Sequence, residues 1–153
     1  MQVRKILFPT DFSTMGDNAL EYATKLARES GARLLIVHVE EPPMVYGEGA
    51  HYYGVPAPER PVMQIMLNAI KPHDASVAYE HRLIDGVPAE EIVALAKREG
   101  VDLIVMSTHG RTGLGRLLMG SVAEQVLRHA ACPVLVVKPT AKAPAPVATS
   151  SKA

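Results

Sequence analysis

Five strand-like runs recur along the chain, and each has the length of a β-strand. They cover residues 3–8, 33–39, 78–84, 103–107 and 134–138. Most of these runs are continuously apolar and do not alternate with polar residues, which is the pattern of strands covered on both faces. The pattern therefore predicts a parallel sheet with helices on each side.

Apolar residues at helical spacing follow the first run. A helix is expected over residues 14–30, with Ser13 or Thr14 as its N-cap and Asp17 in its first turn. Gly31 is suited to the left-handed position after its end. The residues expected to face the sheet are Ala19, Ala23, Leu26 and Ala27.

Two later helices carry signals at their ends. A helix is expected over residues 88–99. Pro88 suits its first position, and Gly100 suits the position just after its end. The last helix is expected to begin at Ser121, with Glu124 completing a capping box. The expected inward faces are Ile92, Val93, Leu95 and Ala96 for one helix, and Val122, Val126 and Leu127 for the other.

The stretch from residue 40 to residue 74 has a weaker pattern. Residues 42–58 are rich in proline, glycine and tyrosine and are interpreted as a long irregular connection. His51, Tyr52 and Tyr53 match no metal-ligand spacing and are assigned to a mobile lid. A crossover helix is expected over residues 59–70, with Val62, Ile65, Met66 and Ala69 facing inward.

The alternation of strands and helices predicts a single α/β domain over residues 1–139. Right-handed crossovers then give one doubly wound, five-stranded parallel sheet of Rossmann-like type, with helices on both faces. Residues 140–153 have the proline- and alanine-rich composition of a disordered tail.

Composition narrows the class of protein. The 153 residues suit one domain, and 48% hydrophobic with 21% charged residues is ordinary for a soluble globular chain. Sixteen basic and sixteen acidic residues balance, so net charge indicates neither a nucleic-acid nor a membrane partner. Cys132 is the only cysteine, and no apolar run is long enough to span a membrane. A cytoplasmic protein is expected.

A glycine-bearing loop before the last helix is the first candidate site. Gly110 is followed after nine residues by Gly120 and Ser121 at a predicted helix start, where backbone N–H groups favour an anion. The Walker pattern is absent, and Leu118 interrupts the dinucleotide pattern that begins at Gly113. The alternative is a surface loop in which Ser121 only caps its helix.

Two other predicted strand ends lie at the same edge of the sheet. Asp11 follows the first strand, and its carboxylate can accept hydrogen bonds from two hydroxyl groups, as acidic ribose-binding residues do. The alternative is that Asp11 is a turn or N-cap residue. His38, near the end of the second strand, lies in an apolar run and is interpreted as a core histidine with satisfied hydrogen bonds.

The segment STHGRTGLGRLLMGSVAEQVLRHAACPVLVVK resembles the C-terminal signature of the universal stress protein family, and KILFPTDFS resembles its first strand and loop. The resemblance covers about residues 3–138. Nucleotide-binding members carry G-x2-G-x9-G-[S/T]. Here Gly110, Gly120 and Ser121 match that motif, while Ser107 stands in its first glycine position.

The resemblance implies an adenine-nucleotide site for ATP, ADP or AMP, with Mg²⁺ or Mn²⁺ bridging the phosphates. It assigns Asp11 to the ribose and the phosphates or metal, and the backbone of Val39 to the adenine. Arg111 and Arg116 lie within the loop. His109 also lies there, and it either donates a hydrogen bond to a phosphate or packs behind the loop. The expected nucleotide-binding set is Pro9, Thr10, Asp11, Val39, Met106, Ser107, His109, Gly110, Arg111, Gly113, Gly120, Ser121 and Val122.

The resemblance also implies a homodimeric, stress-response regulatory protein. The last strand, from Pro133 to Lys138, is short and apolar and would lie at a sheet edge, where family members pair with a twofold mate. The sequence shows no general base beside the loop, so any ATP hydrolysis is expected to be slow. The alternatives are a dimeric interaction module that binds no nucleotide, a slow ATP hydrolase, and an ATP-cleaving transferase of related fold.

Overall fold

The computed structural model describes residues 1–42, 51–52, 55–56, 58–108 and 119–139. In this part of the chain, five strands form the main sheet: β1 (Lys5–Pro9), β2 (Arg33–Glu40), β5 (Tyr79–Asp85), β6 (Leu103–Ser107) and β7 (Val134–Val137). Four α-helices connect them: α1 (Asp17–Ser30), α2 (Arg60–Ala69), α3 (Pro88–Arg98) and α4 (Ser121–His129). Each predicted strand is present, with ends that differ by at most two residues from those expected.

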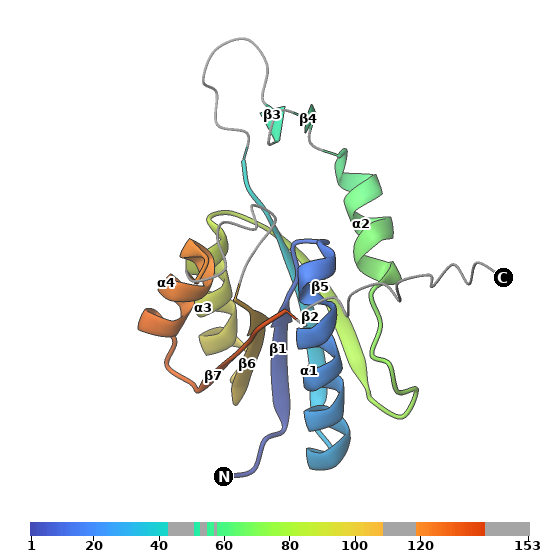
Figure 1. Cartoon of the computed structure of the whole chain (residues 1–153), viewed down its shortest axis with the longest axis vertical. Helices are drawn as coiled ribbons and strands as arrows, with labels where there is room; N and C mark the ends of the chain where they lie inside the picture. The colour runs from blue at the N-terminus through green and yellow to red at the C-terminus, as the bar shows by residue number, and fades with distance from the viewer. Residues whose placement is uncertain (43–50, 53–54, 57, 109–118, 140–153) are drawn as a thin grey trace, which may run out of the picture.

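The sheet has the order β5-β2-β1-β6-β7, and all of its pairs are parallel. The chain builds outward from β1 to β2 and β5, and then returns to add β6 and β7 on the other side of β1 (Figure 1). The direction of winding therefore reverses between β1 and β6, which confirms the predicted doubly wound fold. In such sheets this reversal creates a crevice at the carboxyl ends of the strands.

Two apolar clusters cover the two faces of the sheet. Helices α1 and α2 lie on one face, where Ala23 and Leu67 pack against Ile6 and Phe8. Helices α3 and α4 lie on the other face, where Leu95 and Val126 pack on the strands (Figure 1). Adjacent residues of β1 alternate between the clusters and all are nearly inaccessible, which explains the continuously apolar strand sequences.

The ends of the first helix differ in part from the expectation. A short 3-10 turn, η1 (Thr14–Gly16), precedes α1, and Gly16 is the N-cap of α1. The predicted side-chain cap is wrong, because neither Ser13 nor Gly16 makes a side-chain capping hydrogen bond. The predicted stop is confirmed: Gly31 has φ 71°, in the left-handed region that glycine adopts without strain.

The predicted inward face of α2 is wrong. Met63 and Leu67 are its buried residues, whereas Val62 is 45% exposed and Ile65 is 69% exposed. The helix carries apolar side chains on both sides, so the periodicity of the sequence fits two orientations. Met66 is only partly covered and Ala69 is exposed, which places the whole predicted stripe away from the sheet.

Helix α3 matches its prediction closely, and α4 matches in part. Pro88 begins α3, and Gly100 follows it with φ 62°. In α4, Val126 is buried, whereas Leu127 is 47% exposed and does not belong to the inward face. Ala123 is buried in the core in place of Leu127.

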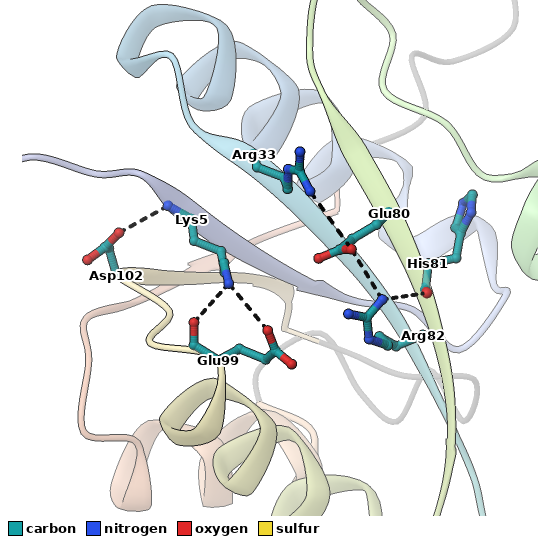
Figure 2. Close-up of polar contacts among 7 residues, drawn as sticks. All are labelled: Lys5, Arg33, Glu80, His81, Arg82, Glu99 and Asp102. Atoms are coloured by element: carbon teal, nitrogen blue, oxygen red, sulfur yellow. Dashed lines mark hydrogen bonds and ion pairs between the residues drawn. The ribbon is translucent and has the colours of Figure 1, made fainter.

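Polar contacts hold the amino ends of the strands together. Figure 2 shows the Lys5 ammonium donating to the backbone oxygen of Glu99 at 2.9 Å and contacting its carboxylate at 3.3 Å. One carboxylate oxygen of Asp102 accepts the amides of Arg4 and Lys5 at 2.8 and 3.0 Å. These two backbone hydrogen bonds hold the pKa of the Asp102 carboxyl below its ordinary value. The start of β1 is thereby fixed to the turn between α3 and β6.

The segment between β2 and α2 contains β3 (His51–Tyr52) and β4 (Val55–Pro56), which pair antiparallel. This small hairpin was not predicted. The rest of residues 43–57, and the tail from residue 140 onward, lie outside the described residues. Within the ranges that the structure describes, no helix is both long and apolar enough to cross a membrane.

Candidate nucleotide site at the carboxyl edge of the sheet

The carboxyl ends of β1, β2 and β6 bring six of the thirteen predicted residues to one edge: Pro9, Thr10, Asp11, Val39, Met106 and Ser107. Pro9 is the last residue of β1 and pairs with Val37, and the amide of Thr10 donates to the Val37 carbonyl oxygen at 2.8 Å. Val39 and Met106 are 8% and 6% exposed, and both belong to the cluster under α3 and α4. Beyond Leu7 and its partner Ile104, the structure gives no further pairing between β1 and β6.

The loop after β1 is a turn held by its own side chains. The Thr10 hydroxyl accepts the amide of Phe12 at 3.1 Å, and the Asp11 carboxylate accepts the amide of Ser13 at 2.9 Å. Asp11 is therefore a turn residue, as the alternative interpretation expected, and one of its oxygens already accepts a backbone N–H. Phe12 has φ 67°, a left-handed conformation that is strained for a side chain of this size.

The buried ring of His38 supports this turn from β2. Its Nδ1 lies 2.8 Å from the Thr10 carbonyl oxygen, and its ring lies 4.1 Å from that of Phe12 between centroids. Because a carbonyl oxygen only accepts, Nδ1 carries the proton of this hydrogen bond. His38 is 6% exposed, so the interpretation as a satisfied core histidine is confirmed.

The start of α4 is tied directly to the end of β6. The amide of Thr108 donates to the Val137 carbonyl oxygen at 3.1 Å, and the Thr108 carbonyl oxygen accepts the amide of Gly120 at 2.7 Å. The helix start therefore lies at the same edge as Asp11. Neither Thr108 nor Phe12 was among the predicted residues, although Thr108 directly follows a predicted strand and Phe12 lies in the turn after another.

The predicted capping box at Ser121 is wrong. Gly120 is the N-cap, Ser121 is the first helical residue, and the Glu124 carboxylate accepts from Arg128 at 2.8 Å within the same helix. Glycine has no side chain with which to cap the first turn. In the part of the chain that the structure describes, no acceptor is bonded to the amides of residues 121–123. These three N–H groups are the ones that a helix leaves without internal partners.

Several predicted residues cannot be placed. His109, Gly110, Arg111, Gly113 and Arg116 lie outside the described residues. Among the residues that are described, no group of three or more histidine, cysteine, aspartate or glutamate side chains is arranged to hold a metal ion. Ser121 is exposed, and Val122 is partly buried against the cluster under α3 and α4.

A shallow depression of about 330 Å³ lies on the other side of the Thr10 turn. It runs between the start of α1 and the end of α2, and its lining includes Phe12, Ser13, Ile70 and Lys71. Thr10 is the only predicted site residue that it touches. Val39 and Met106 lie under the opposite face of the sheet, so this depression is not the predicted site.

The reversal between β1 and β6, with a turn on one side and a glycine-led helix start on the other, defines a doubly wound α/β protein of Rossmann-like class. A sequence model of the universal stress protein family matches residues 2–138. A universal stress protein of Methanocaldococcus jannaschii is 38% identical over a 146-residue alignment, and the match covers 88% of this chain and 82% of the relative. The chain belongs to the universal stress protein family.

Solved structures share the fold. A second universal stress protein of M. jannaschii is 29% identical with a TM-score of 0.70, over 92% of this chain and 99% of its own. A universal stress protein in complex with cAMP is 24% identical with a TM-score of 0.69, over 92% and 100% of the two chains. One from Archaeoglobus fulgidus in complex with dAMP is 23% identical with a TM-score of 0.64, over 90% and 100%.

Proposed function

We propose that this protein binds an adenine nucleotide at the carboxyl edge between β1 and β6, and that it acts in the cytoplasm as a regulatory protein of the stress response. The ligands we propose are ATP, ADP and AMP. The reversal of winding at this edge supports the proposal, because doubly wound sheets bind ligands at such a switch point.

The observation that carries the proposal is the start of α4. The amides of residues 121–123 have no acceptor within the described chain, and Gly120 is anchored to Thr108 at the end of β6. Backbone N–H groups at a helix start, together with the helix dipole, favour a phosphate. The serine cap that would compete with the phosphate for these amides is not formed.

The opposite side of the site is the turn at Asp11. Its backbone is held rigidly by Thr10, Ser13 and His38, so a ligand would meet a carboxylate that is already positioned. We assign Asp11 to the ribose hydroxyls and the backbone of Val39 to the adenine, as the family resemblance implies. Two solved universal stress proteins are complexes with the adenine nucleotides cAMP and dAMP, which supports this ligand class for a member of the family.

A divalent cation would be held mainly by the nucleotide. Asp11 supplies a carboxylate at this edge, and among the described residues no group of three or more histidine, cysteine, aspartate or glutamate side chains is arranged to hold a metal ion. Mg²⁺ is commonly bound in this way, by substrate phosphates with one or two carboxylates. Mg²⁺ or Mn²⁺ is therefore proposed as a companion of ATP and not as a resident ion.

We further propose that the protein is a homodimer that pairs through β7. This strand is at the edge of the sheet, and Leu135 is 36% exposed on it. An apolar edge strand presents unpaired backbone groups to a second copy. A Leu135→Arg variant should reduce the mass measured by light scattering from that of a dimer to that of a monomer, and a wild-type monomer would contradict the proposal.

Ligand binding is tested by calorimetry with AMP and with ATP plus Mg²⁺. The wild-type protein should bind, and its melting temperature should rise, because a ligand at 100 times its Kd adds about 2.7 kcal/mol of stability. Gly120→Arg should abolish both effects, because it fills the space before the α4 amides. The backbone at Gly120 has φ −60° and ψ 153°, which any residue adopts, so the variant should fold.

Ser30→Arg provides a matched control. It adds the same side chain at an exposed position at the end of α1, which lies at the amino edge of the sheet. It should bind as the wild type does. If wild type and Gly120→Arg give the same calorimetric response, the proposed site is wrong.

A further inference from the structure

The turn after β1 holds a strained backbone at the edge of the proposed site. In the part of the chain that the structure describes, Phe12 is the only residue other than glycine with a positive φ, 67°. In this left-handed conformation the Cβ atom crowds the backbone, a cost that glycine avoids. Strained residues persist where their surroundings fix them, and they gather at functional sites. Phe12 directly follows Asp11, so its strain calls for a functional explanation.

Packing of the Phe12 ring does not account for this strain. The ring is only partly buried, at the margin of the cluster under α1. Its contact with β2 is more specific: it lies against the His38 ring with 4.1 Å between centroids and 32° between planes. The turn is therefore fixed to the sheet by a buried residue of the neighbouring strand.

Strand β2 also holds the residue on the other side of Asp11. The carbonyl oxygen of Val37 accepts the Thr10 amide at 2.8 Å, and Nδ1 of His38 donates to the Thr10 carbonyl oxygen at 2.8 Å. Both backbone polar groups of Thr10 are thus bonded to β2. Because the Thr10 carbonyl shares a rigid peptide plane with the Asp11 amide, this hydrogen bond also fixes where the Asp11 backbone begins.

These two contacts of His38, with the Thr10 carbonyl oxygen and with the Phe12 ring, are called the His38 clamp. They enclose Asp11, whose carboxylate accepts the amide of Ser13 at 2.9 Å. The direction of the Asp11 side chain therefore depends on a turn that is strained at its centre and clamped on both sides.

The His38 clamp reaches the turn from one face of the sheet. Side chains alternate along a strand, and Val37 and Val39 belong to the cluster under α3 and α4. His38 lies between them and faces the other side, where Phe12 packs against the cluster under α1. Val39 and Met106 of the proposed site face away from the His38 ring. Any effect of His38 on a ligand at that site passes through the turn.

We propose that His38 is a positioning residue of the nucleotide site. The His38 clamp holds the strained turn in the conformation in which the Asp11 carboxylate meets the ribose hydroxyls of the ligand. This proposal rests on the proposed function, which assigns Asp11 to the ribose. A ligand that requires one conformation binds more weakly in proportion to the time that the free protein spends in others. Without the clamp, the strain at Phe12 favours relaxed conformations of the turn.

The effect should depend on the ribose hydroxyls. AMP carries both of them, whereas its 2′,3′-dideoxy analogue keeps the base and the phosphate and lacks both. His38→Phe keeps a ring against Phe12 but cannot donate to Thr10, so AMP should bind about tenfold more weakly and the dideoxy analogue should change much less. His38→Asn places an amide nitrogen where Nδ1 lies and should restore the preference for AMP.

His81 provides a matched control. Its Nε2 lies 2.7 Å from the carbonyl oxygen of Ile70, in a partly buried hydrogen bond between β5 and the end of α2. This bond involves no residue of the turn. His81→Phe should also lower the free energy of unfolding, because a carbonyl oxygen loses its donor. It should leave the ratio of AMP affinity to dideoxy affinity unchanged.

The test is calorimetric titration of the wild type and the three variants with both ligands, together with amide hydrogen exchange of the ligand-free proteins measured by NMR. The amides of Phe12 and Ser13 form hydrogen bonds within the turn. In His38→Phe they should exchange about tenfold faster than in the wild type, because the turn opens more often. His38→Asn and His81→Phe should leave their exchange unchanged.

Four outcomes overturn the inference. A His38→Phe protein that keeps the wild-type preference for AMP contradicts it and leaves the proposed function intact. Equal losses for both ligands in His38→Phe, or a lost preference in His81→Phe, would show an effect of stability and contradict the positioning role. Equal affinities of the wild type for both ligands contradict the assignment of Asp11 to the ribose and the inference with it. Absence of AMP binding by the wild type contradicts the proposed function as well.

Discussion

The imidazole Nδ1 of His38 lies 2.8 Å from the carbonyl oxygen of Thr10 and donates a hydrogen bond to it. This contact joins the interior of β2 to the first residue after β1. It also brings the His38 ring against Phe12, whose backbone is in a strained left-handed conformation. A single buried side chain therefore supports both the path of the turn and its strained residue.

Replacing His38 should destabilise the protein. His38→Phe retains an aromatic ring against Phe12 but cannot donate to Thr10, so a partly buried carbonyl oxygen loses a donor. The expected loss in the free energy of unfolding is about 1–3 kcal/mol, measured by urea denaturation.

His38→Ala removes the ring as well as the donor and should cost more than His38→Phe. If His38→Phe were as stable as the wild type, the hydrogen bond to Thr10 would not be important for the turn. If both variants lost the same amount, the ring contact with Phe12 would contribute nothing.

Helix α2 offers a matched pair of aliphatic residues. Leu67 is 0% exposed and Ile65 is 69% exposed. Leu67→Ala should lower the free energy of unfolding by about 2–5 kcal/mol, because it opens a cavity in the core. Ile65→Ala should change it by less than about 0.5 kcal/mol. Equal effects in urea denaturation would contradict the burial of Leu67 and the exposure of Ile65.

Acid should remove the contribution of Asp102. Its folded pKa is lowered by the amides of Arg4 and Lys5, so its stabilising effect is present above the unfolded pKa and disappears as the pH falls through the folded value. Asp102→Asn should therefore be less stable than wild type at about pH 7, and the difference should shrink below about pH 4. Urea midpoints across this range measure it, and a difference that is constant with pH would contradict the prediction.

Cys132 should react slowly. Partial burial against the α3 and α4 cluster raises the pKa of its thiol, so the thiolate fraction at neutral pH is small. Alkylation by iodoacetamide should be slower in the folded protein than in the same protein unfolded in urea, and should accelerate as the pH rises. Equal rates in the two states would show that the thiol is accessible and unperturbed, against its interpretation as a packing residue.

The sheet could be predicted because most of its strands are apolar on both faces. Residues such as Leu7 and Phe8 point to opposite clusters, and the sequence around them therefore has no polar position. Parallel strands of this kind need helical crossovers, and the handedness of crossovers leaves few topologies. The predicted helix ends at Gly31 and Gly100 are also confirmed, because both glycines take left-handed conformations.

Other features required information that sequence periodicity does not contain. Both sides of α2 are apolar, so whether Leu67 or Ile65 is buried depends on how the helix packs against the sheet. At α4, Ser121 and Glu124 have the spacing of a capping box, but Gly120, whose amide donates to Thr108, is the N-cap, and Ser121 is the first helical residue.

The pairing of β1 with β6 has a consequence for how the chain folds. Strands β1, β2 and β5 follow one another, whereas Lys5 and Asp102 are 97 positions apart. Closing a longer loop costs more conformational entropy, so this seam should form after the first three strands have assembled. The proposed nucleotide edge would then exist only in the completed domain. A ligand bound there would slow the separation of β1, β2 and β5 from β6 and β7.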